Sequence, residues 1–180
     1  MKNTLYYGDN LDILRKYIPD ESVDLIYLDP PFNSKINYNI LFREPSGNAS
    51  EAQITAFEDT WHWTEEAART YTEIMNVAPA KVAEAMSAFK QIVGLNDMMA
   101  YLTMMCARLL ELRRVLKSSG SIYLHCDPTA SHYLKILLDT VFGPQNFRNE
   151  IIWKRTSAHS GSKRWGPVHD VLLFYGKSEN

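Results

Sequence analysis

The chain has 180 residues, of which 46% are hydrophobic and 12% aromatic, and its formal net charge is −2. This length suits one domain, and this composition supplies enough apolar side chains for a packed core, which excludes a disordered protein. No apolar run reaches the length of a membrane span, and the N-terminus lacks the apolar core of a secretory signal, so we expect a cytoplasmic protein that does not associate with membranes.

Residues 4–28 predict a strand, a helix and a second strand. Residues 4–7 are strand-like, and apolar residues then recur at helical spacing from residue 11 until Pro19. Residues 23–28 (VDLIYL) form a nearly continuous apolar run, which predicts a strand buried on both faces. Such a unit joins parallel strands, so Asp9 and Asp29, which follow the two strands, are expected at the carboxyl edge of one sheet, where ligands bind.

Residues 33–95 interrupt this regular pattern and are interpreted as an insertion over the edge of the sheet. They begin as a polar, asparagine-rich stretch, continue through Trp61-His62-Trp63 and end in a segment rich in Ala, Glu and Met that predicts helix. The two tryptophans favour packing over substrate contact. A long helix follows, with Asn96 or Asp97 as its N-cap, and its apolar residues alternate at spacings of four and three, which is typical of a core helix: Met98, Leu102, Met105, Leu109, Leu112 and Leu116.

The C-terminal part predicts a strand at 121–126, a helix at 131–141, and strands at 150–153 and 170–175. The last two strands are joined by a basic loop, residues 154–168, without helical pattern, which indicates an antiparallel hairpin. The predicted fold class is therefore α/β, with a mostly parallel sheet, an antiparallel hairpin at its C-terminal end and helices on both faces. Cys106 and Cys126 are expected to be buried thiols, and no disulfide is expected.

The charge is unevenly distributed along the chain. Residues 1–147 carry 13 basic and 18 acidic side chains, whereas residues 148–180 carry 6 basic and 3 acidic ones. The basic residues concentrate near Trp153 and Trp165, a mixture that suits phosphates and bases: Arg148, Lys154, Arg155, Lys163 and Arg164. We predict that Lys154, Arg155, Lys163 and Arg164 contact nucleic acid, although an ordinary solvated loop explains the charge equally well.

Asp29-Pro30-Pro31-Phe32 is the most informative motif, because it follows a predicted strand and lies at the ligand-binding edge. Consecutive prolines fix two φ angles, so the Asp29 carboxylate and the Pro30 carbonyl can be held as paired hydrogen-bond acceptors. Two such acceptors, drawing on the hydrogens of an exocyclic amine, free its lone pair for attack on a methyl group. Phe32 offers a flat face on which an extruded base can stack. The alternative is a proline-rich turn in which Asp29 is only a cap.

Four segments together resemble the amino-methylating DNA methyltransferases in the permuted β-type order, where the catalytic tetrapeptide comes early. They are GDNLDIL (8–14), VDLIYLDPPFN (23–33), residues 96–127, and FRNEIIWKR (147–155). The resemblance implies a partial Rossmann-like methyltransferase sheet and methyl transfer from S-adenosylmethionine to double-stranded DNA. It implies catalytic roles for Asp29, Pro30, Pro31 and Phe32, although the family more often has Tyr at the last position.

In the family, an initial Asp in the tetrapeptide more often accompanies adenine than cytosine, so the resemblance favours a flipped adenine as the target. It also implies that Asp9, with Asn10 beside it, contacts the adenine of S-adenosylmethionine. Asp9 alternatively caps the following helix, and both roles are compatible. No metal site is expected, because His125, Cys126, Asp127 and His132, and the pair His159 and His169, lack the spacing of metal ligands.

Donor sites of this family need a glycine-rich turn, and the eight glycines contain no Phe-x-Gly-x-Gly pattern. We therefore interpret residues 1–180 as the N-terminal part of one catalytic domain whose donor-binding segment lies further along a longer reading frame. The alternatives are a catalytically incomplete DNA-binding remnant, or an amino-methyltransferase for cytosine N4, RNA or protein. A companion restriction endonuclease subunit and oligomerisation stay open.

Overall fold

A computed structural model describes residues 3–30, 61–157 and 168–179. The described elements are α1 (Asn10–Tyr17), β1 (Val23–Leu28), α2 (Glu65–Val77), α3 (Ala80–Val93), α4 (Asp97–Val115), β2 (Leu116–Cys126), α5 (Ser131–Phe142), a short 3-10 helix η1 (Pro144–Asn146), β3 (Phe147–Lys154) and β4 (His169–Gly176). The predicted helices are confirmed, as are the strands predicted from residue 23 onward, although β2 and β3 begin five and three residues earlier than predicted. α4 ends at Val115, and β2 begins at Leu116, which the sequence assigned to the apolar series of the helix.

The four described strands form one open sheet in the order β1-β2-β4-β3. β1 and β2 are parallel, whereas β4 pairs antiparallel with both β2 and β3. The predicted C-terminal hairpin is confirmed, but the prediction of a mostly parallel sheet is wrong. Residues 4–7, which were predicted to form a strand parallel to residues 23–28, form no strand, and Leu5 and Tyr7 are 96% and 85% exposed. The described residues therefore contain one parallel pair, β1 with β2.

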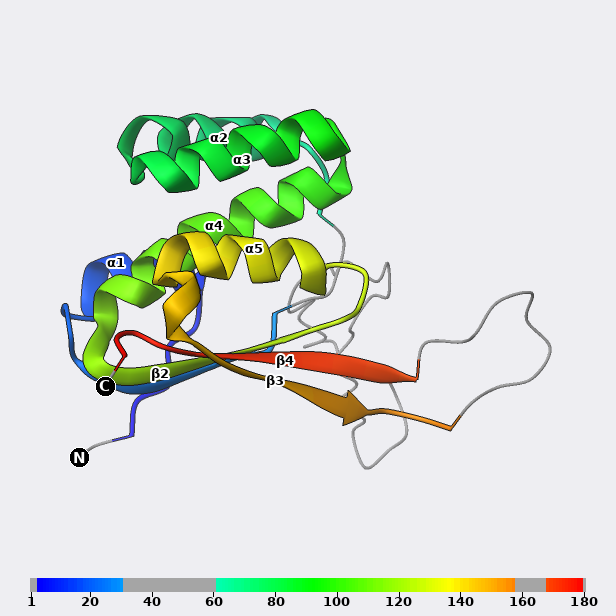
Figure 1. The fold of residues 1–180 in the computed structure, drawn as a ribbon. Coiled ribbons are helices and arrows are strands. Elements are labelled where there is room, and N and C mark those ends of the chain that lie inside the picture. Colours follow the sequence, from blue (N-terminus) through cyan, green and yellow to red (C-terminus); the bar gives the residue numbers. More distant parts are fainter. Residues whose placement is uncertain (1–2, 31–60, 158–167, 180) are drawn as a thin grey trace, which may run out of the picture.

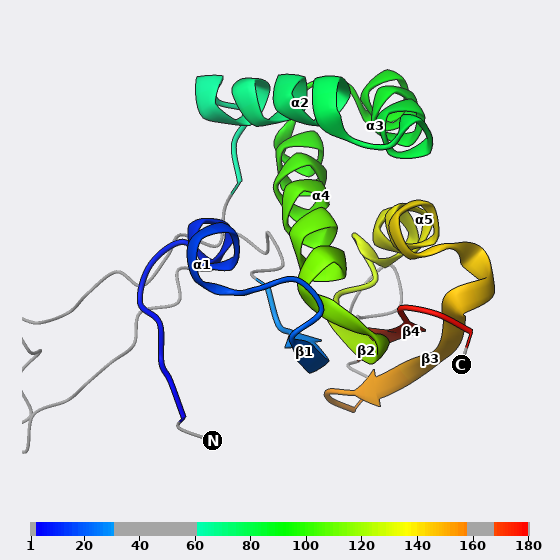
Figure 2. The same cartoon turned by 90° about the vertical axis from the view of Figure 1, so that its left-hand side faces the viewer.

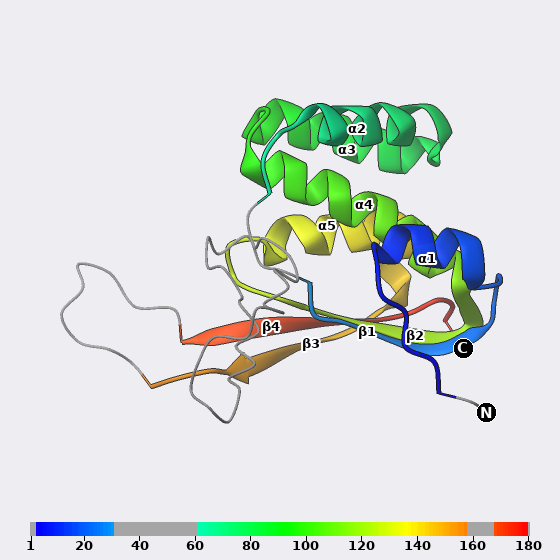
Figure 3. The ribbon, with the colours of Figure 1, turned by 180° about the vertical axis from the view of Figure 1, so that it is seen from behind.

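The described helices all lie on one face of the sheet, in two layers. α1, α4 and α5 are nearest to the sheet, and α2 and α3 form an outer layer against α4 and α5 (Figures 1 and 3). The view along the sheet shows the same arrangement, with the strands below and every helix above them (Figure 2). The prediction of helices on both faces is therefore wrong for this part of the chain. The single parallel crossover, from β1 to β2, carries α2, α3 and α4 to one side, and α5 packs on that side as well.

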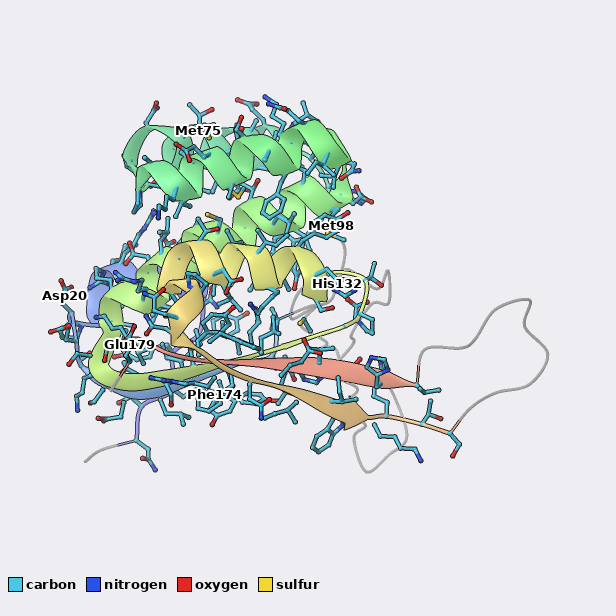
Figure 4. All side chains as sticks on the ribbon, viewed as in Figure 1. Asp20, Met75, Met98, His132, Phe174 and Glu179 are labelled. Atoms are coloured by element: carbon cyan, nitrogen blue, oxygen red, sulfur yellow. The ribbon has the colours of Figure 1, made fainter. Side chains whose placement is uncertain are left out.

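The opposite face of the sheet is open within the described residues. In β1, Ile26 is buried while Leu25 and Tyr27 are 59% and 54% exposed, so the prediction that this strand is buried on both faces is wrong. Phe174 of β4 lies on the open face (Figure 4), where its ring stacks on that of Tyr123 with the centroids 4.3 Å apart. β1 is therefore buried on one face only, by the helices above it.

α4 is the central helix of the core. Its N-cap is Asn96, one of the two predicted candidates, and the Met99 amide donates to the Asn96 side chain at 3.1 Å. A continuous core cluster joins α4 to β2 and α5, and it includes Met105, Leu109, Ile122, Leu124, Leu134 and Leu138. Cys106 and Cys126 are free and buried, as predicted, and burial raises the pKa of each thiol to about 12. Within the described ranges, no helix combines the length and apolar character needed to cross a membrane.

Candidate active site

The carboxyl ends of β1 and β2 meet at one edge of the sheet, which is also where β4 begins and β3 ends. Leu28 pairs with Leu124 in the parallel register, so Asp29 and His125 follow at neighbouring positions. Lys154 pairs with His169 at the same edge, and Asp170 follows in β4. Polar and charged side chains from four strand ends therefore gather in one place, at the edge where open α/β sheets bind ligands.

Asp29 and Pro30 line an open cavity of about 520 Å³ at this edge. The same cavity is lined by Gly8, Asp9 and Asn10, although residues 4–7 form no strand. The structure thus brings together the residues predicted to bind the donor and those predicted to hold the target amine. The Asp29 side chain is 64% exposed. Pro31 and Phe32 lie outside the described residues.

Asp9 is the N-cap of α1, as one reading of the sequence predicted, and its Oδ1 accepts from the Leu11 amide at 2.7 Å. The same carboxylate binds Arg108 of α4, whose Nη2 donates to Oδ1 at 2.8 Å and to Oδ2 at 2.9 Å. Arg108 Nε also donates to Asn10 Oδ1 at 2.7 Å. An ionised carboxylate has about four acceptor positions, so Asp9 still has capacity on Oδ2 for a further donor.

Arg108 is the charged residue of an otherwise buried part of α4. Its side chain is 14% exposed, and burial lowers the pKa of its guanidinium while the neighbouring Asp9 carboxylate raises it. A buried cation is stable only when it is paired, and Asp9 and Asn10 supply that pairing. Arg108 thereby ties α1 to α4 and forms one wall of the cavity.

A second cavity of about 270 Å³ adjoins the first and shares Asp9, Trp61, Met104 and Arg108 with it. Thr103 lines this cavity, is fully buried and has no hydrogen-bond partner for its hydroxyl among the described residues. Buried polar groups are normally paired, so an unsatisfied hydroxyl on a cavity wall is what a polar ligand would be expected to complete. The two tryptophans of 61–63 are half-buried against the core, in line with the predicted packing role.

His125 lies between two carboxylates at the sheet edge. Its Nδ1 is 3.1 Å from Asp29 Oδ1, and its Nε2 is 3.2 Å from Asp170 Oδ2. Arg155 Nη1 donates to the other oxygen of Asp170, Oδ1, at 3.2 Å. A continuous set of contacts therefore leads from Asp29 across β2 and β4 to the end of β3.

Two of the four residues predicted to contact nucleic acid lie at this edge. Lys154 ends β3 and is exposed, and Arg155 follows it with its side chain 54% exposed. Trp153, beside them, is 58% exposed. Lys163 and Arg164 lie outside the described residues. The described part of the basic segment thus lies at the same edge of the sheet as Asp29, with β2 and β4 between them.

Arg108, Asp170 and the role of His125 were missed by sequence reasoning. A signal existed for the first two, because each is a charge inside an apolar run: Arg108 within MMAYLTMMCARLL and Asp170 at the start of VLLFY. His125 was considered only as a metal ligand. Across the described ranges no group of three His, Cys, Asp or Glu side chains is arranged to hold a metal ion.

Residues 23–180 match the family model N6_N4_Mtase, described as DNA methylase. The chain is 28% identical over 179 residues to the Type III restriction-modification enzyme StyLTI Mod subunit of Salmonella typhimurium, covering 98% of the chain and 24% of that protein. It is 26% identical over 181 residues to the Type II methyltransferase M.KpnI of Klebsiella pneumoniae, covering 98% of the chain and 33% of the relative. The Type III restriction-modification enzyme EcoP15I Mod subunit of Escherichia coli is 23% identical over 181 residues, with 99% and 24% covered. The chain therefore spans between a quarter and a third of the length of these relatives.

Proposed function

The chain belongs to the N6_N4_Mtase family of DNA methylases, and from this premise we propose that it is the target-base part of a site-specific DNA methyltransferase. The proposed reaction transfers a methyl group from S-adenosylmethionine to the exocyclic amine of a flipped adenine. Adenine is proposed over cytosine because Asp29 is the first residue of the tetrapeptide. Two of the three relatives named above are Mod subunits of restriction-modification enzymes, so we extend the proposal to a companion restriction subunit.

The observation that carries the proposal is the shared cavity of Asp9, Asn10, Asp29 and Pro30. Its volume of about 520 Å³ lies within the ~300–1,000 Å³ typical of small-molecule sites. The residues come from two segments of the chain that are separated by α1 and β1. A proline-rich turn with a purely structural Asp29 would not require that Asp29 face a cavity beside Asp9.

The chemistry follows from two acceptors held at the end of β1. The lone pair of a base amine is delocalised into the ring, which makes the amine a weak nucleophile. The Asp29 carboxylate and the Pro30 carbonyl accept hydrogen bonds from the amine and favour its tetrahedral form, in which the lone pair is free to attack. Since the acceptors are fixed before the base arrives, little reorganisation is needed. No covalent bond to the protein is required.

The residues around the cavity suit S-adenosylmethionine in part. The remaining acceptor capacity of Asp9 suits hydroxyl or amine hydrogens of the donor, and Met104 and Met105 supply apolar walls. The Thr103 hydroxyl, which is unsatisfied within the described part of the chain, lies in the adjoining cavity. When bound, the donor supplies an electrophilic methyl group on a sulfonium. Asp9 and Asn10 would hold it beside Asp29, with Arg108 fixing the position of both.

The test is a labelled-methyl transfer assay with the natural polypeptide that carries these residues, comparing the wild type with Asp29→Ala. Asp29→Ala is expected to abolish transfer while donor binding, measured by calorimetry, is largely retained. The matched control is Asp24→Asn on β1, the strand that precedes Asp29; it is an exposed carboxylate that pairs with Lys117 away from the cavity, and its activity is expected to be unchanged. Retained activity in Asp29→Ala would overturn the assigned role.

The identity of the methylated nucleoside tests the choice of base. Enzymatic digestion of the product DNA followed by mass spectrometry is expected to give N6-methyladenine. N4-methylcytosine would overturn the adenine assignment and leave the amino-methyltransferase assignment in place. The absence of any methylated nucleoside with the wild-type protein, under conditions where donor and DNA both bind, would favour the DNA-binding remnant.

A further inference from the structure

His125 connects an exposed carboxylate to a buried one. The side chain of Asp29 is 64% exposed, that of His125 is 16% exposed, and that of Asp170 is 4% exposed. The ring nitrogens of His125 face the two carboxylates at 3.1 Å and 3.2 Å. The contacts therefore run from the interior of the sheet outward to the residue proposed to hold the target amine.

An exposed carboxylate at the end of a strand does not hold one orientation by itself. Water competes for both oxygens of Asp29, and free rotation of the side chain costs conformational entropy when it is fixed on substrate binding. The contact of His125 Nδ1 with Asp29 Oδ1, at 3.1 Å, restricts that rotation and leaves the second oxygen, Oδ2, as the acceptor for the amine. The parallel register of β1 and β2 brings the two residues together, since Leu28 pairs with Leu124.

Asp170 holds the other side of the imidazole. A buried carboxylate is costly unless it is paired, and Asp170 is paired through Oδ2 with His125 and through Oδ1 with Arg155. An ionised carboxylate only accepts, so Nε2 donates to Asp170 in the hydrogen bond at 3.2 Å, while Nδ1 faces Asp29 at 3.1 Å. Asp170 thus holds the imidazole ring through Nε2, and the ring in that orientation directs Nδ1 at Asp29.

We infer that His125 is a positioning residue for methyl transfer, which orients the Asp29 carboxylate through Nδ1 and is itself anchored by Asp170 through Nε2. This inference rests on the proposed function. In this arrangement Asp29 contacts the amine, and His125 determines which of the two Asp29 oxygens makes that contact.

Two substitutions of His125 distinguish the role of Nδ1 from that of Nε2. The amide nitrogen of Asn occupies about the place of Nδ1, and that of Gln about the place of Nε2. His125→Asn therefore keeps a donor for Asp29, and His125→Gln keeps a donor for Asp170 only. We expect kcat to fall by roughly 10- to 100-fold in His125→Gln and to be largely restored in His125→Asn, because small misplacement of a reacting group costs about that much. The KM for DNA and the Kd for S-adenosylmethionine are expected to stay near the wild-type values in both.

The control is His132→Gln on α5, an exposed histidine that contributes to neither cavity (Figure 4). Its kcat is expected to equal that of the wild type. Thermal unfolding of all three variants shows whether they are folded to the same extent. If the Asn and Gln variants lose kcat equally while remaining folded, the loss reflects the absence of the ring and the positioning role is overturned.

A second measurement does not depend on activity. In ¹⁵N NMR spectra of the histidine rings, Asp29→Asn is expected to shift the Nδ1 resonance of His125, and Asp170→Asn its Nε2 resonance. Unmoved resonances in both variants would overturn the inference directly. If both variants show these shifts but the wild-type protein transfers no methyl group, the proposed function is overturned, and the positioning role with it. Active wild-type protein with equal Asn and Gln variants would overturn the positioning role alone.

Discussion

The pair formed by Arg108 and Asp9 gives a prediction whose size can be worked out from the structure. Arg108→Met removes the guanidinium while keeping most of the buried volume, and Asp9→Asn removes the charge while keeping a good N-cap for α1. Exposed ion pairs contribute about 0.2–1 kcal/mol, whereas hydrogen bonds to charged groups reach about 1.5–3 kcal/mol. Since Arg108 is 14% exposed and Asp9 is 51% exposed, we expect a coupling free energy of about 1 kcal/mol, at the upper end of the range for exposed pairs.

The assay is a double-mutant cycle on the free energy of unfolding in urea, using the wild type, the two single variants and the double variant. The pair Arg15 and Glu73 is the control, because it also joins α1 to another helix at 2.8 Å but has side chains 41% and 48% exposed. Its coupling is expected to be smaller, about 0.3 kcal/mol. A coupling between Arg108 and Asp9 no larger than that of the control would refute the argument that Arg108 fixes the start of α1 against α4.

Two further predictions concern DNA binding and pH. A variant that neutralises Lys154, Arg155, Lys163 and Arg164 together is expected to bind DNA more weakly. The slope of log affinity against log salt is expected to become shallower by roughly 0.9 for each phosphate that the variant no longer neutralises. An unchanged slope in fluorescence anisotropy titrations would exclude these residues from the interface. The free energy of unfolding is expected to fall as the pH rises from 9.0, the ordinary thiol pKa, to about 12, because the folded chain keeps protons on Cys106 and Cys126 that the unfolded chain releases. Each thiol contributes about 1.4 kcal/mol per pH unit in this window, and circular dichroism melts at several pH values should show a shallower fall in the Cys106→Ala, Cys126→Ala variant.

Periodicity located the helices well because their apolar residues recur at helical spacing. In α4 the apolar spacing and the cap at Asn96 are both local signals, and the structure has the helix at Asp97–Val115, where packing buries it on all sides from Met99 to Ala107. The same holds for α5, which ends where Gly143 takes a positive φ of 93° that favours glycine. Local chemistry decides such elements, so one sequence is enough to predict them.

The sheet was harder to predict because a strand depends on a partner that can lie anywhere in the chain. Residues 4–7 have the apolar and aromatic character of a strand, yet Leu5 is 96% exposed and no described strand pairs with them. Residues 23–28 are apolar enough to be buried on both faces, but the crossover carries the helices to one side and leaves Leu25 and Tyr27 exposed. Apolar character shows that a surface is suited to burial, whereas topology determines whether something covers it.

The residues of the site also differ in whether a local motif or a non-local strand pairing is needed to predict them. Asp29-Pro30 was found because the tetrapeptide is contiguous and follows a strand, so a local motif was sufficient. His125 and Asp170 belong to β2 and β4, and they approach Asp29 only through the pairing of β1 with β2 and of β2 with β4. Once the parallel pairing of β1 with β2 is assumed, however, the residue after Leu124 must lie beside the residue after Leu28. If the pairing of β1 with β2 is extended by one residue beyond Leu28 and Leu124, His125 lies beside Asp29. Sequence reasoning of this kind would have assigned His125 a carboxylate partner instead of a metal.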